Sequence, residues 1–102
     1  MAVTPTEIEA AESAIRNALL VRQHHRRRTE RGDQQREADI GLALERLRES
    51  MKPLRRAIGQ FPYEPQTEAV LEQQEEVRDL SRCIQAQRRR LWKMQLRRKD
   101  DA

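Results

Sequence analysis

Arginine is the residue type with the clearest chemical potential in this sequence. The chain has 18 Arg and only 3 Lys, and a planar guanidinium group can bind a phosphate through two parallel hydrogen bonds. Clustered arginines supply the salt-dependent part of nucleic-acid affinity, which does not depend on base sequence. The candidate phosphate-binding residues form two clusters: Arg26, Arg27, Arg28 and Arg31, then Arg88, Arg89, Arg90, Lys93, Arg97 and Arg98.

The other reactive side chains form no catalytic or metal-binding pattern. His24 and His25 are adjacent and therefore project from different sides of a helix, and no Cys, Asp or Glu accompanies them at ligand spacing. The single cysteine, Cys83, excludes an intramolecular disulfide and, without other thiols, a zinc knuckle. The sequence has no glycine-rich phosphate loop and no local Ser-His-Asp pattern. We expect no catalytic residue, metal, cofactor or small-molecule substrate, and a protein that is not an enzyme.

Composition limits the kind of fold that can hold these residues. The 102 residues include 38 charged ones with a net charge of +4, and Phe, Leu, Ile and Val together number only 20. Three aromatic residues and three glycines argue against most sheet architectures. The expected fold is therefore one all-α domain spanning residues 1–102, with so little core that a second copy or another helical protein is expected to cover part of it.

Targeting signals are not evident in the sequence. No apolar run exceeds the three residues Leu19-Leu20-Val21, so we expect neither a transmembrane segment nor a secretory signal. A lone, unpaired cysteine fits a reducing compartment. The expected location is the cytoplasm or the nucleus.

The first helix is expected over about residues 4–22, followed by a polar segment over 23–37. Thr4 and Glu7 have the spacing of a capping box, in which each side chain bonds to the backbone N–H of the other residue, and Pro5 suits the first helical position. Between Arg22 and Asp39 the only apolar side chain is Ala38. We therefore do not expect this stretch to contribute to the core. It is expected to be either a solvated extension of the helices or a loop.

The second helix is expected over about residues 38–59 and has the most regular apolar spacing in the chain. Its apolar positions alternate at steps of four and three residues, as in the seam of a coiled coil: Ile40, Leu44, Leu47, Met51, Leu54 and Ile58. Pro53 costs about 3 kcal/mol inside a helix. The seam nevertheless keeps its phase across Pro53, which predicts a kink rather than a break.

The third helix is expected over about residues 66–99, after a connector over 60–65 whose Phe61 and Tyr63 are expected to cap the end of the core. One seam position of this helix is apolar throughout, and the other alternates glutamine with Leu or Met. The seam side chains proposed as a helical interface are Val70, Val77, Leu80, Ile84, Leu91 and Met94, together with Trp92 beside them. At about 1.5 Å per residue this helix is roughly 50 Å long, which is longer than the other two can cover. A long C-terminal coiled-coil helix is expected.

Charge is polarised along each helix, with acids first and bases last, which also suits the helix dipole. Short connections make neighbouring helices antiparallel. The C-terminal ends of the first and third helices should then lie at the same end of the molecule. We call their combined cations the basic pole; it comprises the candidate phosphate-binding residues together with Arg22 and Lys99. Such a pole can bind nucleic-acid phosphates or dock onto an acidic protein surface.

The C-terminal segment from Gln87 to Lys99 combines these cations with apolar side chains, among them Trp92. A basic amphipathic helix of this kind can bind a partner groove, a membrane surface or nucleic acid, and tryptophan is also enriched at protein interfaces. Ile84-Gln85 followed by Arg89 resembles the opening of an IQ motif, the segment that calmodulin-like proteins clasp. Arg90 and Met94 depart from that pattern.

These observations support an all-α helical hairpin or three-helix bundle that is expected to be oligomeric. Two functions follow from them. The first is a non-enzymatic interaction and assembly protein that pairs with a second copy or another helical protein through the two seams. The alternative is a small nucleic-acid-binding protein that uses the basic pole to hold RNA or a duplex phosphate backbone.

Overall fold

The chain folds into three helices that pack side by side. The computed structural model describes residues 3–26 and 33–101, with side chains for 3–26 and 34–95. The helices are α1 (Pro5–His24), α2 (Asp33–Gln60) and α3 (Glu68–Asp101), and a short 3-10 helix, η2 (Phe61–Tyr63), follows α2. Over the described ranges there is no strand. The prediction of an all-α bundle is confirmed, and the structure is the three-helix form.

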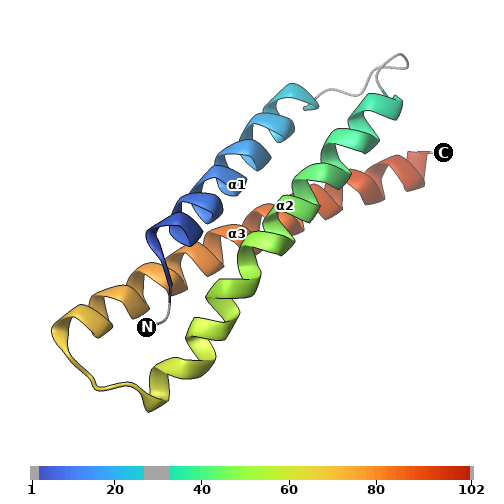
Figure 1. The fold of residues 1–102 in the computed structure, drawn as a ribbon. Coiled ribbons are helices and arrows are strands. Elements are labelled where there is room, and N and C mark those ends of the chain that lie inside the picture. Colours follow the sequence, from blue (N-terminus) through green and yellow to red (C-terminus); the bar gives the residue numbers. More distant parts are fainter. Residues whose placement is uncertain (1–2, 27–32, 102) are drawn as a thin grey trace.

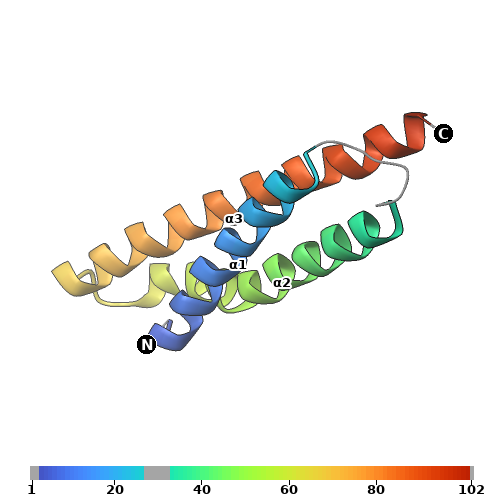
Figure 2. The same cartoon turned by 90° about the horizontal axis from the view of Figure 1, so that it is seen from above.

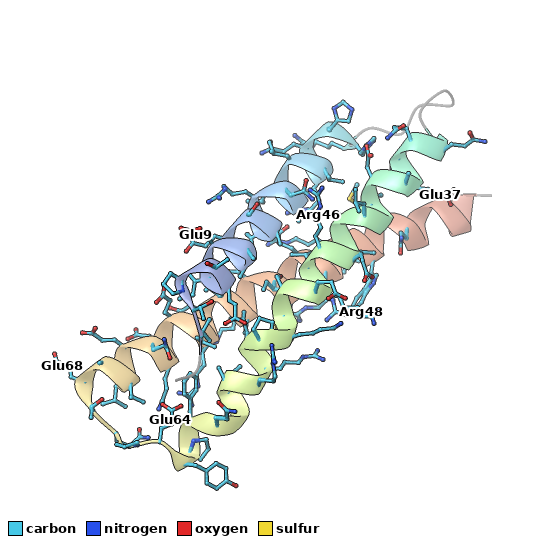
Figure 3. All side chains as sticks on the ribbon, viewed as in Figure 1. Glu9, Glu37, Arg46, Arg48, Glu64 and Glu68 are labelled. Atoms are coloured by element: carbon cyan, nitrogen blue, oxygen red, sulfur yellow. The ribbon has the colours of Figure 1, made fainter. Side chains whose placement is uncertain are left out.

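The bundle is elongated, measuring 54 × 23 × 16 Å along its principal axes. α1 and α3 run in the same direction and α2 runs against both (Figures 1 and 2). The end of α1, the start of α2 and the C-terminal part of α3 consequently lie at one end of the molecule, where the basic pole was expected. Glu64 and Glu68 lie at the other end, away from Glu37 (Figure 3).

Side chains fix the starts of α1 and α3. At α1 the predicted capping box is present: the Thr4 N–H donates to Glu7 Oε1 at 2.9 Å, and the Glu7 N–H donates to Thr4 Oγ1 at 3.2 Å. At α3, Thr67 Oγ1 accepts a hydrogen bond from the Val70 N–H at 3.3 Å. These bonds satisfy backbone donors that have no partner within a helix.

α2 begins at Asp33, five residues before the position expected from its apolar spacing, and it continues through Pro53 to Gln60. The added residues include Gln, Arg and Glu, which are good helix formers although they carry no apolar signal. Arg36 lies one turn before Ile40 and is buried, so its aliphatic stem continues the seam. The polar stretch therefore contributes to the core after all, in contrast to the expectation, and His25 is buried as well.

The core is built from small side chains on α1 and large ones on α2 and α3. The contribution of α1 is Ala11, Ala14 and Ala18, which let the other helices approach closely. The buried apolar residues of α2, η2 and α3 are Ile40, Ala43, Leu47, Met51, Leu54, Ala57, Phe61, Val77, Ile84 and Leu91. Alanine thus supplies part of the core that a count of large apolar residues leaves out.

The two connector aromatics have different environments. Phe61 is 1 % exposed and closes the end of the core, as expected, whereas Tyr63 is 89 % exposed and does not cap it. The glutamines of the α3 seam bond to the N-terminal part of the chain. Gln73 Nε2 donates to the carbonyl of Val3, which precedes α1, at 3.2 Å, and Gln87 Oε1 accepts from Arg22 of α1 at 2.9 Å. These bonds help to fix the position of α1 along α3.

Candidate functional site

The end of the molecule that holds the basic pole is built from all three helices (Figure 2). Arg22 comes from α1 and Arg26 lies just after its end, and Arg88, Arg89, Arg90 and Lys93 come from α3. Of the other predicted phosphate-binding residues, Arg27, Arg28 and Arg31 lie outside the described residues, and the side chains of Arg97 and Arg98 are likewise not described. The Arg26, Arg89, Arg90 and Lys93 side chains are exposed, and Arg88 is partly buried.

Arg22 and Arg90 bring two positive charges together across the α1–α3 contact. Arg22 Nη1 donates to the neutral Gln87 Oε1 at 2.9 Å. Partial burial, together with repulsion from Arg90, lowers the pKa of the Arg22 guanidinium from its usual value. Both cations would therefore gain from a nearby anion.

Arg36 on α2 lies next to the same part of α3 and is 7 % exposed. Its Nη2 reaches the Met94 carbonyl at a long 3.5 Å. Its Nε is enclosed without any hydrogen-bond partner. A buried donor left unpaired costs about 1–3 kcal/mol, and more when the group is charged. Arg36 is therefore the least well satisfied cation among the described side chains.

His25 and Asp39 link α1 to α2 at this end. His25 Nε2 lies 2.7 Å from Asp39 Oδ2, and the His25 side chain is 9 % exposed. Gln35 Nε2 donates to the other carboxylate oxygen, Asp39 Oδ1, at 2.8 Å. The hydrogen bond with His25, followed by that from Gln35, lowers the pKa of the Asp39 carboxyl. Both Asp39 oxygens are thus engaged within the bundle.

Trp92 lies on the flank of α3 and is 43 % exposed. The Arg88 guanidinium carbon lies 4.7 Å from the centroid of the Trp92 ring, which is a cation–π arrangement. The tryptophan is therefore a half-exposed apolar surface with a cation against it, as the sequence suggested.

The side chains proposed as a helical interface lie mainly inside the chain's own bundle. Ile40, Leu47, Met51, Leu54, Val77, Ile84 and Leu91 are buried, while Leu44, Ile58, Leu80 and Met94 are partly buried and pack against them. Val70 is also partly buried. Because Ile84 is completely buried, a protein that clasped the IQ-like segment around this side chain would have to open the core. Of the proposed interface residues, Trp92 alone keeps a largely exposed side chain.

A groove of about 600 Å³ runs along the outside of the bundle between α1 and α2. Its lining residues are Glu7, Ala10, Ser13 and Ala14 of α1 and Glu45, Arg46, Glu49, Ser50 and Pro53 of α2. In Figure 1, α3 passes behind α2, and in Figure 3 Arg46 lies between the ribbons of α1 and α2. The small side chains of Ala10, Ser13, Ala14 and Ser50 leave the hollow open, and the charged side chains of the lining border it.

Two exposed leucines continue the groove toward the basic pole. Leu20 is 64 % exposed and lies two turns after Ser13 on α1, and Leu42 is 54 % exposed and lies one turn before Arg46 on α2. Residues spaced in this way share a helix face. The groove and the two leucines therefore belong to one surface, which we call the α1/α2 face.

Sequence reasoning did not identify Arg36, the His25–Asp39 pair or the α1/α2 face. Arg36 had a detectable signal, because it falls four residues before Ile40 in the seam register. The His25–Asp39 pair had none, because the two residues are brought together by the antiparallel packing of α1 and α2. The groove depends on which faces α3 leaves uncovered, and spacing alone does not show that.

Comparison with known proteins gives no match to a protein family, to a curated protein or to a solved structure. Among the described residues no helix is long and apolar enough to cross a membrane. The described side chains also include no cluster of three or more His, Cys, Asp or Glu residues placed to hold a metal ion.

Proposed function

We propose that this chain is a non-enzymatic assembly protein that associates with a second copy of itself through the outer surface of its helices. The observation that supports this proposal is the α1/α2 face, a mostly apolar groove of about 600 Å³ with two leucines, each more than half exposed, at its end. A hollow beside exposed leucines offers a partner chain apolar surface to bury, although charged side chains such as Glu45 and Arg46 border it. The seams hold the bundle together, and the association surface lies outside them.

Co-purification of two differently tagged copies tests this proposal. Both copies are expressed in one cell, and one tag is used for capture. Self-association predicts that the copy with the other tag is recovered in a near-stoichiometric amount with the captured copy. It also predicts that added free chain replaces the recovered copy. Recovery of the captured copy alone, at concentrations where both copies are folded by circular dichroism, would overturn the proposal.

Nucleic-acid binding through the basic pole is the second candidate function. One observation favours it: Arg22 and Arg90 lie close enough for their positive charges to repel each other. A phosphate group would relieve this repulsion by supplying negative charge and hydrogen-bond acceptors. Bound phosphates would also make the affinity strongly dependent on salt.

Fluorescence anisotropy with a short duplex RNA tests the second candidate. We expect binding that weakens steeply from low to moderate salt, and we expect loss of binding when Arg88, Arg89 and Arg90 are replaced by glutamine. The matched control replaces three exposed arginines away from the pole, Arg55, Arg56 and Arg78, and should bind like the wild type. Equal weakening in both triple variants would show that only net charge matters and would remove the pole as a site.

A further inference from the structure

We infer that the α1/α2 face pairs with the same face of a second copy, antiparallel, about a two-fold axis that runs across the helices. This inference rests on the proposed self-association and names the surface and the geometry that carry it. In such a dimer α1 lies against α1 of the partner copy and α2 against α2. An interface of this type must be complementary to itself, because each residue meets its counterpart in reverse order.

The shape of the α1/α2 face meets this condition. One half is a hollow, lined by small side chains such as Ala10 and Ser13 on α1 and Ser50 on α2. The other half carries the exposed Leu20 and Leu42. A face that has a projection at one end and a hollow at the other can close on itself when one copy is turned end over end.

The spacing is equal on the two helices, so a single axis serves both. Leu20 lies seven residues from Ser13 on α1, and Leu42 lies seven residues from Glu49 on α2. At about 1.5 Å per residue, each offset is roughly 10 Å. An axis that passes residues 16–17 of α1 and 45–46 of α2 therefore places Leu20 of each copy over Ser13 of the other, and Leu42 over the stem of Glu49, and both of these residues line the hollow.

The charges on α2 fit the same axis. Residue 45 of one copy faces residue 46 of the other, so Glu45 meets Arg46 twice in the dimer. In the single chain Glu45 has an exposed contact with Arg48, with 3.6 Å between Arg48 Nη1 and Glu45 Oε2, and it also lies next to Glu49. An exposed pair of this kind contributes little to stability, and its partner can be exchanged at low cost. Charge complementarity of the face with itself, in the register that shape requires, favours a second copy over an unrelated helix.

Variants of the two leucines and of the hollow test this geometry. Leu20→Gln with Leu42→Gln removes the projections, and Ser13→Leu fills the hollow. Either change should weaken self-association by at least about a hundredfold, because it acts at two places in a symmetric dimer. Folding should be unaffected, since these side chains lie at the surface. Leu71→Gln on α3 is the matched control, because Leu71 is 49 % exposed and lies off this face.

A charge exchange provides a test that does not depend on apolar packing. Glu45→Arg alone places two like charges together at both sides of the axis and should weaken the dimer. Glu45→Arg combined with Arg46→Glu restores opposite charges in the reversed order and should recover self-association. This recovery is specific to the antiparallel register, because no other register makes residues 45 and 46 face each other.

Sedimentation velocity of these variants separates the interface from the proposed function. Loss of the dimer in the leucine and hollow variants, retention in Leu71→Gln, and recovery in the double charge variant support the inference. If the variant with Leu20→Gln and Leu42→Gln still forms the dimer and Leu71→Gln does not, this interface is overturned. Self-association itself would still stand in that case. A wild-type chain that remains monomeric overturns the proposed function and the interface together.

Discussion

His25 Nε2 lies 2.7 Å from Asp39 Oδ2, and this bond joins the residue that caps the C-terminal end of α1 to α2. The bond lies at the end of the bundle where cations from three helices gather. It holds the start of α2 against α1 and places a negative charge among the surrounding arginines.

Replacement of Asp39 by asparagine should lower the thermal midpoint by roughly 5 °C, because His25 would lose its carboxylate partner at a largely enclosed position. Asp79→Asn is the control, since Asp79 makes only an exposed contact with Arg82 one turn away on α3. Thermal unfolding followed by circular dichroism at neutral pH measures both variants. Equal midpoints for the two variants would show that the His25–Asp39 bond does not stabilise the bundle.

The same carboxylate predicts a loss of stability in acid. Hydrogen bonds lower the Asp39 pKa in the folded state, so as the pH falls the unfolded chain takes up this proton first, near its usual value of about 4. Stability is therefore present above about pH 4 and is lost as the pH falls further, through the folded-state pKa. Urea unfolding between pH 6 and pH 3 should show a shallower loss in Asp39→Asn than in the wild type. Part of the pH dependence that remains in Asp39→Asn comes from Glu49, because its hydrogen bond with Lys52 lowers the Glu49 pKa in the folded state.

Arg36→Met should raise the free energy of unfolding by about 1 kcal/mol, because it removes an enclosed Nε–H that has no acceptor and keeps the apolar stem. Urea unfolding in a buffer without phosphate or sulfate measures this change. Arg46→Met, at an exposed position, should change stability by much less. A clear loss of stability in Arg36→Met would mean that the guanidinium makes a net favourable interaction in the folded chain.

The seams should behave as the core of a single chain. Leu47→Ala and Ile84→Ala each remove a completely buried side chain and should cost about 2–5 kcal/mol. Leu42→Ala, by contrast, removes a side chain that is more than half exposed and should cost little in a dilute, monomeric sample. Unfolding at several protein concentrations checks this ranking. A cost for Leu47→Ala that disappears on dilution would place the seam between chains instead.

Pro53→Ala should stabilise the bundle by about 1–3 kcal/mol, because alanine restores a backbone donor and removes a clash inside the continuous helix α2. Lys52→Ala next to it serves as the control for a surface change. Denaturant unfolding measures both. A loss of stability in Pro53→Ala would indicate that α2 needs the proline to pack against α1.

Much of this architecture follows from local rules that the sequence makes visible. The Thr4–Glu7 box places the start of α1, and the alternating spacing from Ile40 to Ile58 gives the buried face of α2. The start of α2 was placed too late because Arg36 replaces an apolar residue in the seam register. The closure of the core within one chain was also hidden, because the alanines of α1 allow close packing without adding large side chains.

The surfaces could not be predicted in the same way. Contacts such as Arg22 with Gln87 and His25 with Asp39 depend on how far each helix slides along its neighbours, and helix periodicity leaves this sliding undetermined. The α1/α2 face exists because α3 covers the opposite side of those two helices. Its residues, such as Ser13 and Leu42, have no unusual spacing of their own.

Sedimentation equilibrium of the wild-type chain across the micromolar range tests the central claim most directly. Self-association predicts an average mass that rises with concentration from the 12.1 kDa of one chain toward twice that value. A mass that stays at 12.1 kDa over the whole range, in a sample that is fully helical, would contradict it.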